Sequence, residues 1–596
     1  MATTEQLAAD PVTLHQLFSA DNSLRCPLFQ RPYVWKPDNI KRLWDDIDSV
    51  LEGQCDVRFL GALVFDNESA STSSSPGLYW IIDGQQRLTS LYLSLCALSL
   101  VAKEAGSSEL SDALSDEYLL SRKTTSRLQP KLSPTLQDTR QFNQVVLSTL
   151  GEKAKVFRAQ ESGASTGTLI DAYELIRKEV RRRCLDAENK VSVELVSRLR
   201  EVLLEKLEFV EIRLGQKHDA NEVFDRLNKE GARLGIVDLI RNEVLKRLKD
   251  DASSAEEVYT TQWRPFEESF NSQETMEGYF FPHALTRDSG VTKSRTFISL
   301  SKRWAATYGA AATPIEQISA VMDDLREHVD VYHHLREGKS VSLPRSVYTD
   351  RLDALHRMRC PSVVYPYIFS LHSAVRSGAE SEQDAAKALL LVETFLFRRA
   401  MSGIEPTGLH AVFKGLWPQV GTNIGKLRAQ LENKTVKFPN DEEFKIAIDS
   451  APLYTRKIRN FAMLELERSF TKGDVLKTFP EMTADHVLPQ SPTADWASKF
   501  TKAQINRWID TWANLVPLSA QANSGKGNRS WRETRDRLGN ETVFATTKHL
   551  LDEFSDWNPE SLEVRSQRIA IWALSRWADV STPVFQLEGA KSKEKS

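Results

Sequence analysis

The stretch that organises the chain is LYWIIDGQQRLTSLYLSLCALSLVA, residues 78–102. Its first five residues are aromatic or branched apolar ones, which predicts a β-strand. Residues 88–102 are strongly apolar and long enough for a helix. A strand, a tight turn and a helix in succession aim free backbone N–H groups and a helix dipole at one point, residues 83–87. That point suits an anion such as a nucleotide phosphate.

The same turn has a second interpretation that needs no ligand. Asp83 is placed to act as a helix N-cap, and Gln86 three positions later would complete a capping box. Arg87 is the part that a capping box does not explain. A cation in the first turn opposes the helix dipole unless an anion is present. The sequence leaves both interpretations open.

The flanking segments alternate between helical and extended patterns. Leu14, Leu17 and Phe18 have helical spacing, so we expect a short helix over residues 11–20. Prolines within residues 27–37 predict a loop that presents its aromatic side chains. The other elements expected in this half are an amphipathic helix over residues 38–51, strands over 57–66 and 207–214, and helices over 219–231 and 237–242.

Residues 256–441 are helical almost throughout, and they predict a helical connector. Arg398 and Arg399 follow an apolar stretch there. They either reach a phosphate backbone or form a solvated or salt-bridged face. Most of the tryptophans beyond residue 500 are expected in the core of a small C-terminal domain.

Composition bounds the class of protein. At 596 residues and 67.5 kDa the chain exceeds what one hydrophobic core organises, so several domains are expected. It has no apolar run of transmembrane length and no signal-peptide pattern, which predicts a soluble cytoplasmic protein with no membrane partner. Five scattered cysteines argue against zinc ribbons and disulfides. A net charge of -3 leaves the partner open.

A second motif lies near the C-terminus, in the stretches DHVLPQ (485–490), WANLVP (512–517) and NSGKGN (523–528). The order is an Asp-His pair, an Asn on a second apolar strand, and another Asn. That order can bring one base and two oxygen ligands around a hard cation, as phosphodiester hydrolysis requires. A lone His486 would more simply be a core histidine, but its polar neighbours favour catalysis.

Two known domains resemble these patterns. The set of residues 30–35, 83–89 and 224–231 resembles the ParB-like NTPase domain of the GmrSD group of modification-dependent (type IV) restriction enzymes. The C-terminal motif resembles the His-Asn-His (HNH, ββα-metal) nuclease domain of the same group. The resemblance implies a predominantly helical α+β protein. Its expected parts are a ParB-like α/β domain (1–255), a helical connector (256–450), an HNH nuclease domain (451–585) and a disordered tail (586–596).

The resemblance also implies roles in the nuclease domain. His486 would be the general base, and Asn514 would hold the His486 loop. Asp485 and Asn523 would bind Mg²⁺ or Mn²⁺, because an Asn at the last ligand position favours a hard cation over zinc. The residues expected to contact flanking DNA phosphates are Lys526, Asn528 and Arg529.

In the N-terminal domain the resemblance implies binding and hydrolysis of an NTP, either GTP or ATP. Tyr33 and Trp35 would face DNA or a modified base, unless they only close a core. Asn228 would contact the ligand or only cap its helix. The other residues expected near the nucleotide are Gln30, Arg31, Asp83, Gly84, Gln85, Gln86 and Arg87.

The expected function is therefore an NTP-regulated, metal-dependent endonuclease that cleaves modified phage DNA. One alternative is an NTP-switched DNA-binding protein with a vestigial nuclease domain. Another is an RNA-cleaving abortive-infection toxin. A homodimer would pair two nuclease domains, although no interface signature is present in the sequence.

Overall fold

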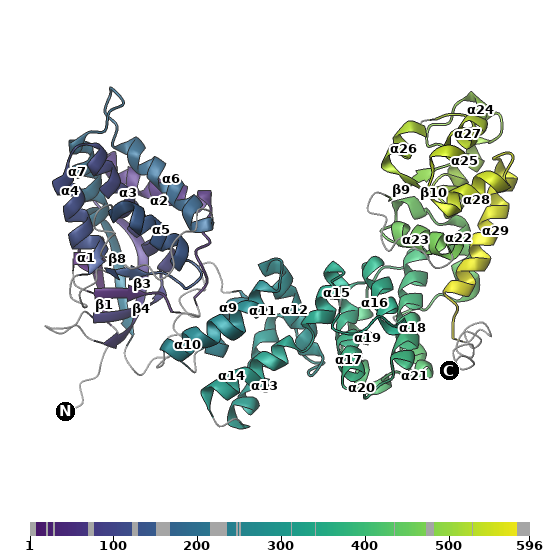
Figure 1. Cartoon of the computed structure of the whole chain (residues 1–596), viewed down its shortest axis with the longest axis horizontal. Helices are drawn as coiled ribbons and strands as arrows, with labels where there is room; N and C mark the ends of the chain where they lie inside the picture. Colours follow the sequence, from purple (N-terminus) through teal and green to yellow (C-terminus); the bar gives the residue numbers. More distant parts are fainter. Residues whose placement is uncertain are drawn as a thin grey trace. The chain divides into compact units, whose positions relative to one another are not determined.

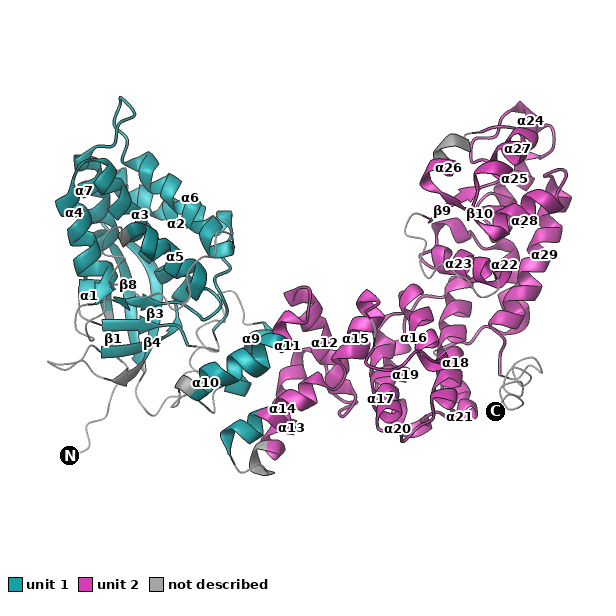
Figure 2. Cartoon of the chain, viewed as in Figure 1, with its two compact units in different colours: residues 1–265, 311–318 teal, residues 266–310, 319–596 magenta. Residues whose placement is uncertain are grey.

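The computed structural model describes residues 8–19, 22–27, 30–69, 77–121, 129–150, 167–214, 235–245, 248, 252–310, 313–339, 341–433, 436–471, 482–526 and 528–580. The chain divides into two compact units (Figure 2). The first comprises residues 1–265 and 311–318, and the second comprises residues 266–310 and 319–596. The division at residues 255, 450 and 585 that the resemblance implies stays a prediction.

Within the described residues, the first unit is built on a mixed six-stranded sheet of order β1-β8-β3-β4-β2-β7, of which Figure 1 labels β1, β3, β4 and β8. β8 lies antiparallel to β1 and parallel to β3, and β4 lies antiparallel to β3 and parallel to β2. β2 also pairs in parallel with β7. The strands are β1 (Ala8–Thr13), β2 (Asn22–Arg25), β3 (Arg58–Ser69), β4 (Gly77–Asp83), β7 (Leu132–Ser133) and β8 (Leu207–Leu214).

The sequence predicted three of these strands, and β3, β4 and β8 confirm them. The helix expected over residues 11–20 is wrong in its first half. β1 continues to Thr13, and the helix α1 covers only Leu14–Ser19. Pro11 and Val12 pair with β8, so pairing with a strand distant in sequence overrides the local helical spacing.

The core of the first unit lies around α3 (Gln85–Glu104), which is buried on nearly every side. This helix is confirmed, although it begins three residues before the predicted start. α2 (Pro37–Leu51) is also confirmed, and it buries the predicted face of Ile40, Leu43, Trp44 and Ile47. The helices that pack against α3 are α4 (Ser108–Ala113), α5 (Thr139–Leu150), α6 (Thr168–Arg183) and α7 (Val193–Glu201).

Helices follow one another through the middle of the chain, as predicted for residues 256–441. Every helix among the described residues is too short or too polar to cross a lipid bilayer. The longer helices of this region are α12 (Gln273–Leu285), α13 (Thr296–Ala310), α14 (Pro314–Arg326), α16 (Val347–Arg357), α17 (Tyr365–Arg376), α18 (Glu382–Met401), α22 (Asp441–Ser450) and α23 (Arg459–Phe470).

Arg398 and Arg399 of α18 are buried, with 0% and 4% of their surface exposed. Arg398 donates to the Trp577 carbonyl at 2.8 Å and pairs with Asp441 at 2.7 Å. Arg399 donates to two backbone carbonyls. The predicted contact with a phosphate backbone and the solvated face are therefore wrong, whereas the salt-bridged alternative holds for Arg398, which pairs with Asp441. These guanidinium groups hold the helical region together from inside.

The C-terminal part of the second unit contains a two-stranded antiparallel ribbon, β9 (Met482–His486) and β10 (Leu515–Ser519). The helix α26 (Ala520–Lys526) follows directly and contacts both strands (Figure 1). The helices α27 (Trp531–Glu541), α28 (Ala545–Glu553) and α29 (Pro559–Arg576) complete this part. The predicted tryptophan core is confirmed by Trp508, Trp531 and Trp557, which lie in one buried cluster, while Trp572 is half-buried.

Candidate functional site

The C-terminal motif is assembled on the ribbon β9–β10. His486 ends β9 opposite Leu515, and Asp485 lies opposite Val516. Thr483 and Asp485 are two positions apart on β9, so they share one face of the ribbon. Asn523 of α26 donates its amide hydrogen to Thr483 Oγ1 at 3.1 Å, which places it beside this face.

Asn514 ties two loops together and is fully buried. Its Oδ1 accepts from the backbone N–H of Leu488 at 2.8 Å, and its Nδ2 donates to the Leu488 carbonyl at 3.0 Å. The same Nδ2 donates to the Ile509 carbonyl at 2.9 Å. Asn514 ends a 3₁₀ turn (Trp512–Asn514) just before β10, so the prediction that it lies on the strand is wrong by one residue.

His486 is 5% exposed and contacts two residues that the sequence did not single out. Its Nε2 lies 3.0 Å from Asp510 Oδ1. The Tyr454 ring lies 4.2 Å from the imidazole, measured between ring centroids. Asp510 is 24 residues away in sequence, and no spacing rule links it to His486. Its position just before WAN was the one signal available.

The remaining predicted DNA-contacting residues lie at the end of α26 and in the turn before α27. Asn528 and Arg529 are exposed. The Arg529 carbonyl accepts from the Trp496 indole N–H at 2.9 Å, which fixes this turn on the core. The side chain of Lys526 lies outside the described residues.

A metal site can be judged here from the chemistry of the donors. Among the described residues, no group of three or more His, Cys, Asp and Glu side chains is arranged to hold a metal ion. The predicted pair, Asp485 and Asn523, contains one such residue, so that finding does not bear on it. A carboxylate and an amide oxygen suit a hard divalent cation that keeps several waters.

The N-terminal turn differs from the capping box considered above. α3 begins at Gln85, and its N-cap is Gly84, with φ of +92° and no side-chain cap. A Cβ on Gly84 would lie 2.3 Å from Leu63 Cδ2, so only glycine fits. The capping-box interpretation of Asp83 is therefore wrong. Asp83 ends β4, and burial raises the pKa of its carboxyl, against the opposing effect of Arg87.

Arg87 is held by β3 rather than left facing solvent. Its guanidinium donates to the carbonyls of Leu60 and Ala62, the latter at 3.1 Å, and lies 3.9 Å from Asp83. These oxygens supply the negative partner that a cation in the first turn requires. Arg87 therefore needs no bound anion to be stable where it is.

The structure brings the two N-terminal motifs together, although about fifty residues separate them. Gln85 Nε2 donates to the Arg31 carbonyl at 2.7 Å, and Gln86 accepts from the Val34 N–H at 2.9 Å. Gln30 Nε2 donates to the Ile82 carbonyl at 2.8 Å. The glutamines thus anchor the loop at residues 30–34 on the start of α3. Gln85 Oε1 is buried and has no hydrogen-bond partner among the described residues.

Tyr33 is a core residue, with 3% of its surface exposed. Its hydroxyl lies 2.7 Å from Ser90 Oγ, and its N–H donates to Asp138 at 2.7 Å. The prediction that Tyr33 faces DNA is wrong, because this ring cannot reach a base without leaving the core. Trp35 is half-buried and packs against the same core. Asn228 lies outside the described residues.

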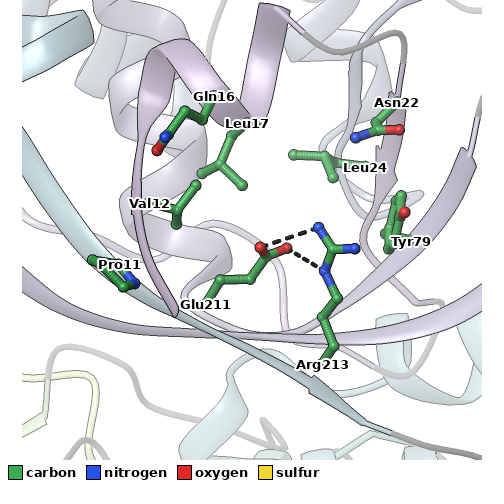
Figure 3. Close-up of a pocket in the computed structure, with 9 residues that line it drawn as sticks. All are labelled: Pro11, Val12, Gln16, Leu17, Asn22, Leu24, Tyr79, Glu211 and Arg213. Carbon is green, nitrogen blue, oxygen red and sulfur yellow. Dashed lines mark hydrogen bonds and ion pairs between the residues drawn. The ribbon is translucent and has the colours of Figure 1, made fainter. Parts of the chain in front are cut away.

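A separate cavity of about 240 Å³ opens on the sheet of the first unit (Figure 3). Glu211 and Arg213 of β8 line it as an ion pair with N–O distances of 2.8 and 3.1 Å. The Arg213 guanidinium lies 5.2 Å from the Tyr79 ring centroid. None of the residues predicted to bind nucleotide or DNA lines this cavity.

Comparisons with known proteins match both motif regions. The family model described as the N-terminal domain of the GmrSD restriction endonuclease matches residues 14–245. The model described as the C-terminal domain of GmrSD restriction endonucleases matches residues 438–572. No curated protein matches the chain. The first match includes the turn at residues 83–87, and the second includes the ribbon that carries His486.

Proposed function

Because the chain carries both GmrSD domains in order and so belongs to the GmrSD restriction endonuclease family, we propose that it cleaves modified foreign DNA under NTP control with a divalent metal. Restriction endonucleases of type IV act on DNA, which sets the substrate class. The observation that carries the proposal is the arrangement around His486. A buried histidine with a carboxylate partner ends β9 directly after Asp485, and Asn514 clamps the loop that follows it.

In this proposal the residues of the ribbon share the work of phosphodiester hydrolysis. His486 takes the proton of the attacking water, and Asn514 keeps the His486 loop in place. Asp485 and Asn523 would hold Mg²⁺ or Mn²⁺, which supplies charge stabilisation when bound. Lys526, Asn528 and Arg529 would contact the flanking phosphates. The succession of β9, β10 and α26 supports an HNH-type ββα unit.

We propose an NTP site at the start of α3 in the first unit. Support comes from the absence of a side-chain cap at Gly84, because the first N–H groups of a helix then favour an anion. Arg31 and Asp83 lie near this end, and Gln85 Oε1 is a buried acceptor available to a ligand donor. The mixed sheet that carries the turn is compatible with a ParB-like domain.

Cleavage of four DNAs tests the proposal. Unmodified, hydroxymethylated, glucosylated and phosphorothioate DNA are each offered with Mg²⁺, with and without GTP and ATP. We expect at least one modified DNA to be cut, and NTP to change the rate. His486→Ala should cut about 100- to 10,000-fold more slowly, as expected for loss of a general base. Equal cutting by His486→Ala and wild type would contradict the nuclease assignment.

The same panel separates the alternative functions. Binding of modified DNA without cutting, by a protein that hydrolyses NTP, would indicate a DNA-binding switch with an inactive nuclease domain. A matched RNA that is cut while all four DNAs stay intact would indicate an RNA-cleaving toxin. A cut that needs no divalent ion, measured in EDTA, would exclude the proposed roles of Asp485 and Asn523.

A further inference from the structure

We propose that Asp510 is a positioning residue that fixes the orientation and the tautomer of His486. The inference rests on the proposed nuclease function, since it assigns a purpose to the contact between the two side chains. Asp510 Oδ1 lies 3.0 Å from His486 Nε2, and 7% of the surface of the His486 side chain is exposed. At this distance a carboxylate accepts a hydrogen bond from an N–H and does not accept one from a bare ring nitrogen.

The contact decides which ring nitrogen acts as the base. A neutral imidazole carries one proton, and Asp510 holds it on Nε2, so the lone pair lies on Nδ1. The proton of the attacking water then passes to Nδ1 while the water oxygen bonds to phosphorus. The P–O3′ bond breaks with its electron pair on O3′, which takes a proton from solvent. The imidazolium formed in this step is stabilised by the adjacent Asp510 carboxylate.

The backbone around the pair is fixed from both sides. Asn514 joins Leu488, two residues after His486, to Ile509, one residue before Asp510. The backbone N–H of Tyr454 donates to the Asp510 carbonyl at 3.1 Å, and the Tyr454 ring packs on the imidazole. The distance between the two side chains is thus set by the fold, which is how a positioning residue is held in a rigid site.

The opposing interpretation is that Asp510 only stabilises the turn before β10. Single-turnover cleavage separates the two, measured on the modified DNA that wild type cuts fastest. Asp510→Ala should lower the rate about 10- to 100-fold, the usual cost of losing an outer-shell partner, with unchanged affinity for DNA. Asp510→Asn keeps the shape of the side chain but removes its charge, and its amide NH2 can donate to Nε2 and so favour the other tautomer; it should therefore remain as slow as Asp510→Ala. Asp495→Ala, at an exposed aspartate of α24 (Ala494–Ala497), is the matched control and should cut like wild type.

A double-mutant cycle with His486→Ala measures whether the effect of Asp510 on the cleavage rate depends on His486. A purely structural role of Asp510 would not produce this dependence. If Asp510 acts through His486, Asp510→Ala should cost nothing further in the His486→Ala background. An additional loss of the same size in that background would overturn the proposal. So would a loss in Asp510→Ala that comes from weaker DNA binding instead of a slower rate.

A spectroscopic test measures the tautomer of His486 directly and does not depend on DNA cleavage. In the full chain labelled with ¹⁵N-histidine, the His486 signals are identified by their disappearance in His486→Ala. At pH 8 we expect the Nε2–H tautomer in wild type and a shift toward Nδ1–H in Asp510→Ala. Retention of the same tautomer in both proteins would overturn the proposal, whether or not the protein cuts DNA. If no DNA is cut and the tautomer does shift, the proposed function fails and the positioning by Asp510 stands.

Discussion

In both motif regions, side-chain amides form hydrogen bonds with backbone groups, but these bonds serve different purposes in the two regions. At the start of α3, Gln85 and Gln86 hold the loop at residues 30–34, and Gln30 of that loop binds β4. Arg87 donates to backbone carbonyls of β3. On the ribbon β9–β10, Asn514 does the holding, while Asn523 makes one side-chain hydrogen bond to a described residue. Under the proposed function, the ribbon would divide structural and chemical roles between different residues, whereas the N-terminal turn would combine both roles in the same side chains. Substitutions should therefore separate stability from activity on the ribbon and seldom at the turn.

Asn514 and Asn523 give the largest expected contrast. Asn514→Ala leaves the Leu488 N–H and two carbonyls buried without their partner, which should cost about 3 kcal/mol of unfolding free energy. Asn523→Ala loses one side-chain hydrogen bond to a described residue at a partly exposed site, so its stability should stay within about 0.5 kcal/mol of wild type. Its cleavage rate should nevertheless fall about 100-fold if the amide oxygen binds the metal. Thermal unfolding and single-turnover cleavage measure the two effects.

A reversed result would change the comparison. If Asn523→Ala unfolds at as low a temperature as Asn514→Ala, the side-chain amides of the ribbon stabilise the fold, as those of the N-terminal turn do. Full cleavage by Asn523→Ala in Mg²⁺ would remove it from the ligand set.

Asp83 offers the cleanest separation available at the N-terminal turn. Arg87→Ala is a poor test, because it removes the hydrogen-bond donor of the Leu60 and Ala62 carbonyls together with any contact to a nucleotide. Asp83→Asn keeps the shape of the side chain and removes its charge. We expect NTP hydrolysis to fall about tenfold or more, the value of one charge-assisted interaction, with an unchanged melting temperature. Unchanged hydrolysis would show that the turn serves only the fold.

Gly84 tests how strictly the turn is built. Gly84→Ala forces a positive φ on alanine and drives its Cβ against Leu63, and we expect a loss of about 2 kcal/mol. Gly106 is the matched control, because it follows the same helix with φ of +82° and nothing lies within 4 Å of an added Cβ. Gly106→Ala should therefore cost about 1 kcal/mol, from backbone strain alone. Equal losses in the two variants, measured by chemical denaturation, would mean that Leu63 moves aside freely.

Sequence patterns predicted the elements whose signals are local. The strand and helix at residues 78–102 and the buried face of α2 follow from residue type and periodicity within one segment. The errors arise where a distant partner decides. Residues 11–13 are extended because β8 pairs with them, and Tyr33 is buried because Ser90 and Asp138 bind it.

The same distinction between local and distant signals applies to the residues of the candidate site. Motif order placed Asp485, His486, Asn514 and Asn523 in one region, and all four lie on or beside the ribbon. Asp510 and Tyr454 were missed, because the fold brings them to His486 from loops that carry no motif. Arg398 shows the converse. Its charge suggested the surface, but buried carbonyls and Asp441 provide an interior environment that no local pattern encodes.

The smallest expected effect is a change in stability with pH, which should have opposite signs in the two units. Burial raises the pKa of Asp138 in the first unit to about 6, so the folded state takes up a proton that the unfolded state still lacks near pH 5.5. Stability from this group rises as pH falls from 7 to 5.5, by about 1 kcal/mol. In the second unit, burial lowers the pKa of His283 and of His328, whose Nδ1 atoms lie 3.0 Å apart. The unfolded histidines then bind protons first, so acidification through their ordinary pKa near 6.5 destabilises that unit.

Calorimetry of the full chain at pH 7 and pH 5.5 should show the transition of the second unit moving to lower temperature. Asp138→Asn should abolish the opposite shift of the first unit, and parallel shifts of both transitions would show that these buried groups do not set the response.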